Sequence, residues 1–569
     1  MTSIATTTTT STGAPTGAAS PVRRPGRVSF VGTGPGDPGL LTVRAVELIR
    51  NATVVVTESP AHAALVAALR GGVGSAEAGD ALVLVDGGAS ESGTPLTPSA
   101  RGRLVVKQAR DGAHVVRLLS GDVLSHGSGP EEAQACRKAG LGVEVVPGVP
   151  ASLAVPAYAG VPLTTRGHDR IAVIRADDAK CDWSAYTGDN TLVLLVPPKT
   201  ELTSCVATAA DALIGAGRAA DTPVSVTVHG TTTAQSTIVS TLAAVAADLA
   251  AVPVPDDDED LGGETVVVVG SVVDLREQLS WFETRPLFGW RVLVPRTKDQ
   301  AVELSEQLQV HGAVPEEVPT ISVEPPRNPQ QMDKAVRGLV EGRYEWVAFT
   351  SVNAVRAVRE KFDEYGLDAR AFSGLKVAAV GEATAQAVAT WGIRPDLVPS
   401  GEQSARGLLE DWPPFDELLD PINRVFLPRA DIATETLVAG LLELGWEVDD
   451  VTAYRTVRAA PPPAPVREAI KAGRFDAVVF TSSSTVRNLV GIAGKPHPST
   501  VIACIGPATA KTAEEHGLRV DVLAETPSAR SLAEALADFG AQRRVAALEA
   551  GEPVARPSER RPAQRRKVT

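Results

Sequence analysis

Short apolar runs alternate with longer Ala-rich runs along most of the chain. Residues 28–32 (VSFVG), 346–349 (WVAF) and 477–480 (AVVF) are apolar runs of this kind, and turn residues and then a helical pattern follow them. Strands that alternate with helices of this length are typical of a parallel β-sheet with helices on both faces. The pattern therefore predicts an α/β protein.

Changes in composition divide the chain further. Because 569 residues are too many for one ordinary core, we expect two large units or three to four compact domains. The expected divisions are a disordered tail at 1–25, a patterned region at 26–282, a linker at 283–289, a second patterned region at 290–539 and a basic disordered tail at 540–569. Within the first patterned region, residues 253–264 (PVPDDDEDLGGE) predict a surface loop.

Composition and charge exclude several classes of protein. No apolar run approaches the roughly 20 residues that cross a bilayer, and the first 25 residues lack the apolar core of a secretory signal. The net charge of -13 argues against bulk binding of nucleic acid. The four cysteines show no metal-ligand spacing and fit a reducing compartment: Cys136, Cys181, Cys205 and Cys504. We expect a cytoplasmic protein without metal, membrane or nucleic-acid partners.

The second patterned region contains an internal repeat. Residues 291–297 (RVLVPRT) recur as 424–430 (RVFLPRA). In the same order, 346–355 recur as 477–486, and 376–385 recur as 501–510. The duplication predicts two similar parallel-sheet α/β domains with a cleft between them.

Small polar residues follow the repeated strands. Ligands of parallel sheets bind beyond the carboxyl ends of the strands, where helix N-termini offer free N–H groups. The residues placed there are Thr350, Ser351, Gly381, Thr384, Thr481, Ser482, Ser483, Gly506 and Thr509. Any one of these turns is explained by helix capping alone. Four turns in two matched pairs favour a site for carboxylate or phosphate.

The order of these motifs resembles the uroporphyrinogen-III synthases over residues 290–539. The resemblance rests on residues 295–297 (PRT), 349–351 (FTS), 380–381 (VG), 452–456 (TAYRT), 480–482 (FTS) and 505–507 (IGP). The family has two similar α/β domains between which the chain crosses and returns. The resemblance therefore implies one domain of about 290–322 plus 456–539, and a second of about 323–450.

The resemblance also implies a reaction. The family closes hydroxymethylbilane, a linear tetrapyrrole with eight carboxylates, to uroporphyrinogen III with inversion of the D ring, and it uses no cofactor. Tyr454 matches the family's candidate general acid, and packing between domains is an equally weighted role for it. The candidate substrate-binding residues on or beside the repeated motifs are Arg296, Thr297, Arg429 and Arg455, although each arginine could equally lie on a solvated face.

The first patterned region resembles the uroporphyrinogen-III C-methyltransferases. Its motifs are residues 32–38 (GTGPGDP), 116–122 (VRLLSGD), 145–148 (VVPG), 155–163 (VPAYAGVPL), 229–231 (HGT) with Gln235, and 279–282 (LSWF). The resemblance implies two α/β domains that bind S-adenosylmethionine, methylation of uroporphyrinogen III to precorrin-2, and a dimer formed through this half. The implied cofactor-binding residues are Gly34, Pro35, Gly36, Asp37, Gly121 and Asp122.

Several positions depart from this second family. Residues 120–129 read SGDVLSHGSG where the family has GGDPFxFGRG, and Glu58 replaces an aspartate. Pro150 replaces a threonine, and 196–197 (VP) replace Met-Gly. We therefore expect a synthase that is either bifunctional or fused to an inactive methylase-like scaffold. A protein that channels tetrapyrroles without chemistry is the alternative from another class. A two-lobed solute-binding protein is disfavoured because no export signal is visible.

Overall fold

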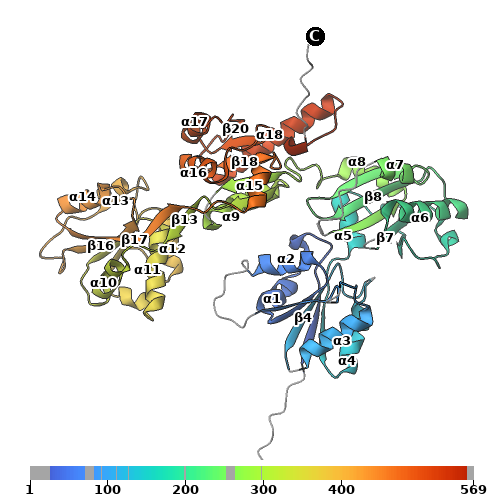
Figure 1. The fold of residues 1–569 in the computed structure, drawn as a ribbon, viewed down its shortest axis with the longest axis horizontal. Helices are drawn as coiled ribbons and strands as arrows, with labels where there is room; N and C mark the ends of the chain where they lie inside the picture. Colours follow the sequence, from blue (N-terminus) through green and yellow to red (C-terminus); the bar gives the residue numbers. More distant parts are fainter. Residues whose placement is uncertain are drawn as a thin grey trace, which may run out of the picture. The chain divides into compact units, whose positions relative to one another are not determined.

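A computed structural model describes residues 26–559 apart from 71–81, 91–92, 111, 126, 198–199, 252–262 and 296–297. The chain divides into two compact units, residues 1–289 and 290–569. Each unit contains two five-stranded sheets with flanking helices (Figure 1). Within the described ranges, no helix combines the length and apolar character needed to cross a membrane.

The first sheet of the first unit is parallel throughout, with the strand order β3-β2-β4-β1-β5. Its strands are β1 (Arg27–Gly32), β2 (Val54–Thr57), β3 (Val83–Asp86), β4 (His114–Leu119) and β5 (Gly142–Val146). The helical elements are η1 (Pro38–Leu40), α1 (Val43–Asn51), α2 (Pro60–Leu69), α3 (Pro98–Ala109) and α4 (Gly129–Lys138). Alternate β1 side chains enter two different cores, Phe30 with α3 and Val31 with α1, because successive side chains point to opposite faces.

The second sheet of this unit is mixed, with the order β6-β7-β10-β8-β9. Only β6 and β7 pair in parallel. Its strands are β6 (Ile171–Arg175), β7 (Thr191–Val196), β8 (Pro223–Gly230), β9 (Ser236–Thr241) and β10 (Glu264–Val269). The helical elements are α5 (Ala151–Ala159), η2 (Trp183–Tyr186), α6 (Leu202–Ala216), α7 (Val245–Ala251), η3 (Ser271–Leu275) and α8 (Arg276–Leu279). Helix α5 packs on one face of this sheet, and α6 with α7 on the other.

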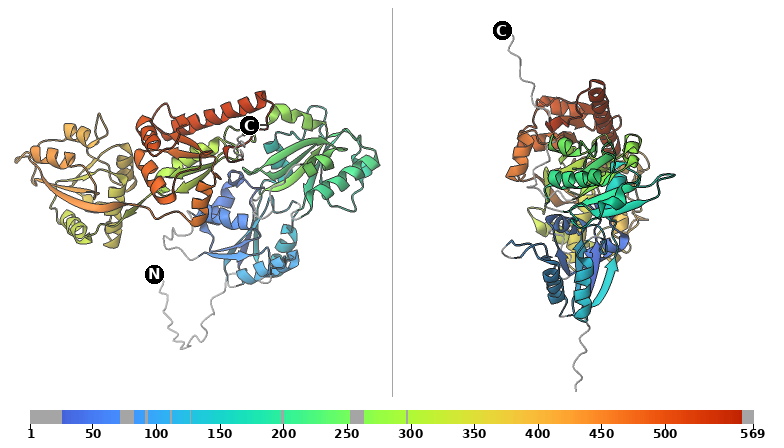
Figure 2. Two further views of the ribbon diagram at one scale, coloured as in Figure 1. Left: turned by 45° about the horizontal axis from the view of Figure 1, so that its top comes forward. Right: turned by 90° about the vertical axis from the view of Figure 1, so that its right-hand side faces the viewer.

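The second unit begins with a parallel sheet of order β12-β11-β18-β19-β20. Its strands are β11 (Arg291–Pro295), β12 (Val314–Val318), β18 (Ala477–Phe480), β19 (Val501–Cys504) and β20 (Val522–Leu523). The helices beside it in the chain are α9 (Lys298–Val310), α15 (Ala464–Lys471), α16 (Ser483–Ala493), α17 (Pro507–Glu515) and α18 (Ala529–Glu549). Figure 2 shows α18 as the long red helix.

The other sheet of this unit has the order β13-β17-β16-β14-β15. Its strands are β13 (Ile321–Glu324), β14 (Trp346–Phe349), β15 (Lys376–Ala379), β16 (Arg424–Ala430) and β17 (Glu447–Arg458). The helical elements are α10 (Pro329–Val340), α11 (Val352–Glu364), η4 (Ala369–Phe372), α12 (Glu382–Thr390), α13 (Ala405–Asp411) and α14 (Thr436–Glu443). The chain therefore leaves the first sheet after β12 and returns to it after β17. Each sheet holds one copy of the repeat, and the repeat did not indicate that β13 pairs antiparallel to β17.

The structure adds contacts at one expected boundary and corrects another. The segment 283–289 is not a bare linker: Glu283 accepts hydrogen bonds from Gln235 and Thr237 and pairs with Arg276, and Leu287 is fully buried. The expected tail from residue 540 is folded as far as Glu559, because α18 continues to Glu549 and Pro557 is buried. The expected tails at 1–25 and 560–569 lie outside the described residues.

Candidate functional site

The glycine-rich turn after β1 meets the turn after β4. Gly34 and Gly36 have φ angles of 74° and 155°, which glycine adopts readily and other residues rarely do. Gly34 N donates to Gly121 O at 3.1 Å, and Gly121 N donates to Gly34 O at 2.8 Å. The structure thus brings together the two turns that the sequence placed at a cofactor site.

A third turn, after β5, completes this arrangement. A Cβ atom on Gly148 would lie 2.1 Å from Gly121 O, so only glycine fits where these backbones touch. Asp122 accepts hydrogen bonds from Gly148 N at 3.1 Å and from the Ser125 hydroxyl at 2.8 Å. Burial works against the charge of Asp122, but these hydrogen bonds outweigh it and lower its pKa. The Asp122 carboxylate therefore holds the turns together.

Asp37 joins the glycine turn to the mixed sheet. Its carboxylate accepts hydrogen bonds from Gly39 N and from the Tyr158 hydroxyl, both at 2.7 Å, and its own N–H donates to Thr231 Oγ1 at 3.0 Å. Burial, and then the bond to Asp37, raise the pKa of Tyr158. The sequence placed Tyr158 in a family motif but gave no sign of this contact.

The loop that receives Asp37 has a strained backbone. His229 and Thr231 have φ angles of 47° and 66°, in the left-handed region that side chains disfavour. Thr231 N donates to Gln235 Oε1 at 2.7 Å, and the Gln235 amide donates to Glu283 Oε1 at 2.7 Å. These bonds hold a strained loop against the glycine turn, and strain of this kind is concentrated at binding sites.

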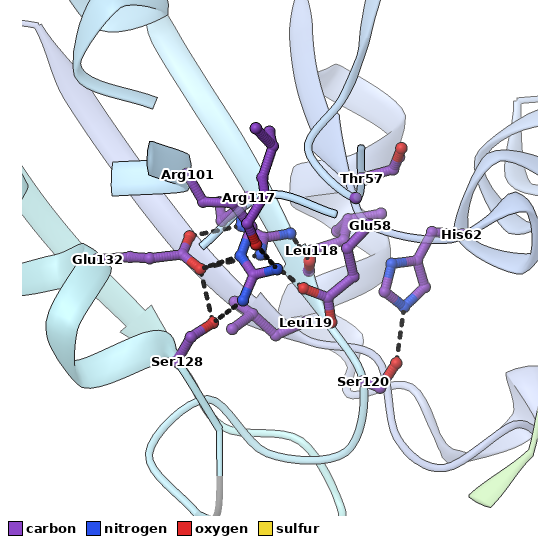
Figure 3. Close-up of polar contacts among 12 residues, drawn as sticks. Thr57, Glu58, His62, Arg101, Arg117, Leu118, Leu119, Ser120, Ser128 and Glu132 are labelled. Carbon is purple, nitrogen blue, oxygen red and sulfur yellow. Dashed lines mark hydrogen bonds and ion pairs between the residues drawn. The ribbon is translucent and has the colours of Figure 1, made fainter. Parts of the chain in front are cut away.

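A buried ion network lies beside the divergent segment 120–129 (Figure 3). Arg117 on β4 is fully buried and donates to Glu132 through Nε at 2.8 Å and to Glu58 Oε2 through Nη2 at 2.6 Å. Glu132 is also fully buried and accepts hydrogen bonds from Arg101 and Ser128. Burial opposes the charge of Glu132, but the bond from Arg117 outweighs it and lowers its pKa. The network fixes Glu58 at the end of β2. The sequence indicated only that Glu58 replaces an aspartate of the resembled family.

Tyr454 lies in β17 inside the core of its domain. It is 7% exposed and belongs to the same buried cluster as Phe349 and Val355. Its hydroxyl oxygen is 2.9 Å from Ser351 Oγ, at the carboxyl end of β14. Ser351 is half-buried and also caps α11 by accepting a hydrogen bond from Ala354 N. The phenol is therefore both a packing residue and one half of a hydroxyl pair at the sheet edge.

The other predicted polar residues divide between the two sheets. Thr350, Ser351, Gly381 and Thr384 follow β14 and β15, whereas Thr481, Ser482, Ser483, Gly506 and Thr509 follow β18 and β19. The structure shows side-chain capping at the N-termini of α11 and α16. Ser351 caps α11, and Ser482 caps α16 with Thr485 in a capping box. Thr384 and Thr509 are buried. Gly381 has a φ angle of 85°, and Gln403 Oε1 accepts a hydrogen bond from the N–H of Glu382 beside it.

The predicted arginines are mostly engaged within the protein. Arg429 is buried and pairs with Asp450 through both Nε and Nη2, and it also donates to Thr434 O. Internal acceptors therefore already engage its guanidinium, and its expected role in binding a substrate carboxylate stays a prediction. Arg455 pairs with Glu324 at 2.6 Å. Arg296 and Thr297 lie outside the described residues.

Comparison with known proteins finds one family match in each unit. Residues 302–534 match the family described as uroporphyrinogen-III synthase HemD, and residues 27–246 match the tetrapyrrole (corrin/porphyrin) methylases. Both resemblances drawn from the sequence are confirmed.

Individual relatives cover one or both units. The porphyrin biosynthesis protein HemD of Ruminiclostridium josui is 28% identical over 529 residues, which are 90% of this chain and 98% of that protein. Siroheme synthase 1 of Klebsiella pneumoniae is 36% identical over 269 residues, and this chain spans about half of its length (52%). A solved uroporphyrin-III C-methyl transferase of Thermus thermophilus, complexed with S-adenyl homocysteine, is 29% identical, with 44% of this chain and 100% of that chain covered and a TM-score of 0.34.

Proposed function

Because the chain joins a tetrapyrrole methylase domain to a uroporphyrinogen-III synthase domain, we propose that it catalyses two consecutive steps of tetrapyrrole biosynthesis. The second unit closes hydroxymethylbilane to uroporphyrinogen III with inversion of the D ring. The first unit methylates this product to precorrin-2 with S-adenosylmethionine. The observation that carries the proposal is that the product of one family is the substrate of the other.

In the synthase step, the hydroxyl pair Tyr454–Ser351 assists the loss of water. The C–O bond of the terminal hydroxymethyl group breaks, its oxygen takes a proton from the pair, and water leaves. The resulting cation is attacked by the D-ring α-carbon that already carries the bridge to ring C, which gives a spiro intermediate. The bond from this carbon to the bridge then breaks, the bridge bonds to the other α-carbon of ring D, and the proton lost there replaces the one that the pair donated. A phenol is a weak acid, so much of the rate comes from holding the bilane in a reactive conformation. Ser351 is the more exposed member of the pair, and we place it next to the substrate.

In the methylase step, the turns at Gly34 and Gly121 hold the cofactor, which supplies an electrophilic methyl group. The residues fit such a ligand, because Gly34 and Gly36 form a turn of positive φ angles without side chains, so a ligand can approach its backbone. Asp37 and Thr231 hold the two sides of this site together. The alternative is a scaffold without activity, which the divergence of residues 120–129 favours.

One assay tests both steps. The whole chain is incubated with hydroxymethylbilane, with and without S-adenosylmethionine, and the porphyrins formed are identified. We expect uroporphyrinogen III in both samples and a methylated product only with the cofactor. The type-I isomer alone, which forms without an enzyme, would remove the synthase proposal. Unmethylated type III in both samples would support the scaffold alternative.

A further inference from the structure

Glu264 is an acid of the first unit that the proposed mechanism does not yet use. It is the first residue of β10, and the register between β10 and β8 shifts between Glu264 and Val266. Such bulges redirect side chains and occur often beside active sites. The side chain is directed at the glycine turn: its Oε1 lies 3.3 Å from the position of a Cβ on Gly121.

The surroundings of this carboxyl group are unfavourable to its charge. Glu264 is half-buried, and within the described part of the chain its carboxyl group makes no hydrogen bond or ion pair. Burial and the negative charge of Glu58 raise the pKa of Glu264 to about 7. Glu58 itself is held at the end of β2 by Arg117, which is shared with Glu132 (Figure 3). The negative charge of Glu58 thus acts on the Glu264 carboxyl group, which lies beside Gly121.

A positively charged ligand would stabilise the Glu264 carboxylate in these surroundings. A carboxylate without a partner is stabilised by a nearby cation, strongly so where water is largely excluded. The tetrapyrrole substrate carries eight carboxylates and would be repelled. S-adenosylmethionine carries a positive sulfonium and a positive ammonium group, whereas S-adenosylhomocysteine has lost the sulfonium charge.

We propose that Glu264 faces the sulfonium end of S-adenosylmethionine and makes the first unit prefer the methyl donor over the demethylated product. The inference rests on the proposed methylase function and adds a residue that determines cofactor specificity. Preference for the charged donor would promote release of the neutral-sulfur product after each transfer.

The test is calorimetric titration of the full-length chain at pH 8, with S-adenosylmethionine and with S-adenosylhomocysteine. The variants are Glu264→Gln, which keeps the size of the side chain, and Glu47→Gln as a control for losing one acid on the exposed face of α1. We expect Glu264→Gln to weaken binding of S-adenosylmethionine about tenfold and to change binding of S-adenosylhomocysteine much less. The control should bind both ligands like wild type, and a cooperative melting transition of the first unit in the same samples reports that this unit is folded.

The outcomes separate the two proposals. If wild type binds neither ligand, the methylase function fails and this inference fails with it. If wild type binds and Glu264→Gln binds S-adenosylmethionine equally well, only the role of Glu264 is overturned. An equal loss for both ligands would also overturn it, because Glu264 would then not distinguish the sulfonium charge.

Discussion

At the scale of single residues, one buried and one half-buried polar group define the chemistry that we assign. The Tyr454 hydroxyl lies at the edge of an apolar core, where a polar group needs a hydrogen-bond partner, and Ser351 supplies it. Glu264 has no such partner within the described ranges, and its surroundings raise its pKa. Because the Tyr454 hydroxyl has a hydrogen-bond partner and the Glu264 carboxyl group has none among the described residues, substituting them should change stability and activity in different ways.

Tyr454→Phe tests the satisfied group. We expect turnover of hydroxymethylbilane to fall roughly tenfold to a thousandfold with KM nearly unchanged, and stability to fall by about 1 kcal/mol, because Ser351 loses its partner. The share of uroporphyrinogen I in the product should rise. Tyr344→Phe is the matched control, since Tyr344 is also buried and donates to Asp449. Wild-type turnover and pure type-III product from Tyr454→Phe would remove Tyr454 from the catalytic residues.

Glu264→Gln also has an expected effect on stability. The pKa of Glu264 is raised in the folded protein, so the unfolded chain binds fewer protons between the unfolded value, about 4.5, and about 7. Stability is then lost as the pH rises through this window. The variant should therefore be more stable than wild type at pH 8 by roughly 1–3 kcal/mol and no more stable at pH 4. Denaturant unfolding without cofactor measures this, and equal stability at pH 8 would contradict the raised pKa.

At the scale of elements, residues 540–559 belong to the folded part of the second unit. Asp476 is fully buried just before β18 and accepts hydrogen bonds from Arg291 N at 2.8 Å and from Ser558 N at 2.9 Å. One carboxylate thus ties the first strand of the unit to the segment after α18. Gly540 and Ala547 in the second half of α18 are buried as well.

Truncation tests this role. A chain that ends at residue 539 should lose about 1–3 kcal/mol, because Asp476 loses a donor and apolar surface is exposed. At roughly 2–4 °C for each kcal/mol, Tm should fall by several degrees. A chain that ends at residue 559 lacks only residues 560–569 and should melt like wild type. Equal melting of the two truncated proteins would show that residues 540–559 add nothing to the fold.

At the scale of the whole molecule, the division into two units predicts independent folding. Each unit has its own sheets and its own buried clusters. Fragments of residues 1–289 and 290–569 should each unfold cooperatively, and the second should convert hydroxymethylbilane alone. Cutting at 282 instead should destabilise the first fragment, because Glu283 and Leu287 are then lost. Failure of both fragments to show a cooperative transition would contradict the division.

The sequence by itself determined the class of fold, the repeat and the two families. These features depend on local patterns, such as apolar runs of strand length and glycines at fixed offsets, that are visible without knowing what packs where. The same motifs named Tyr454, Gly34 and Gly121 as candidate site residues.

Only the tertiary structure decided which polar groups already have a partner within the protein. In the sequence, Arg429 looks like a ligand for carboxylates, yet in the structure it is already bound to Asp450. Residues 253–264 look like a surface loop, yet Glu264 starts a strand and lies beside Gly121. Partners such as Arg117 and Glu58, or Asp476 and Ser558, are far apart along the chain. Their pairing depends on which strands are neighbours in a sheet, and no local pattern of residues encodes that.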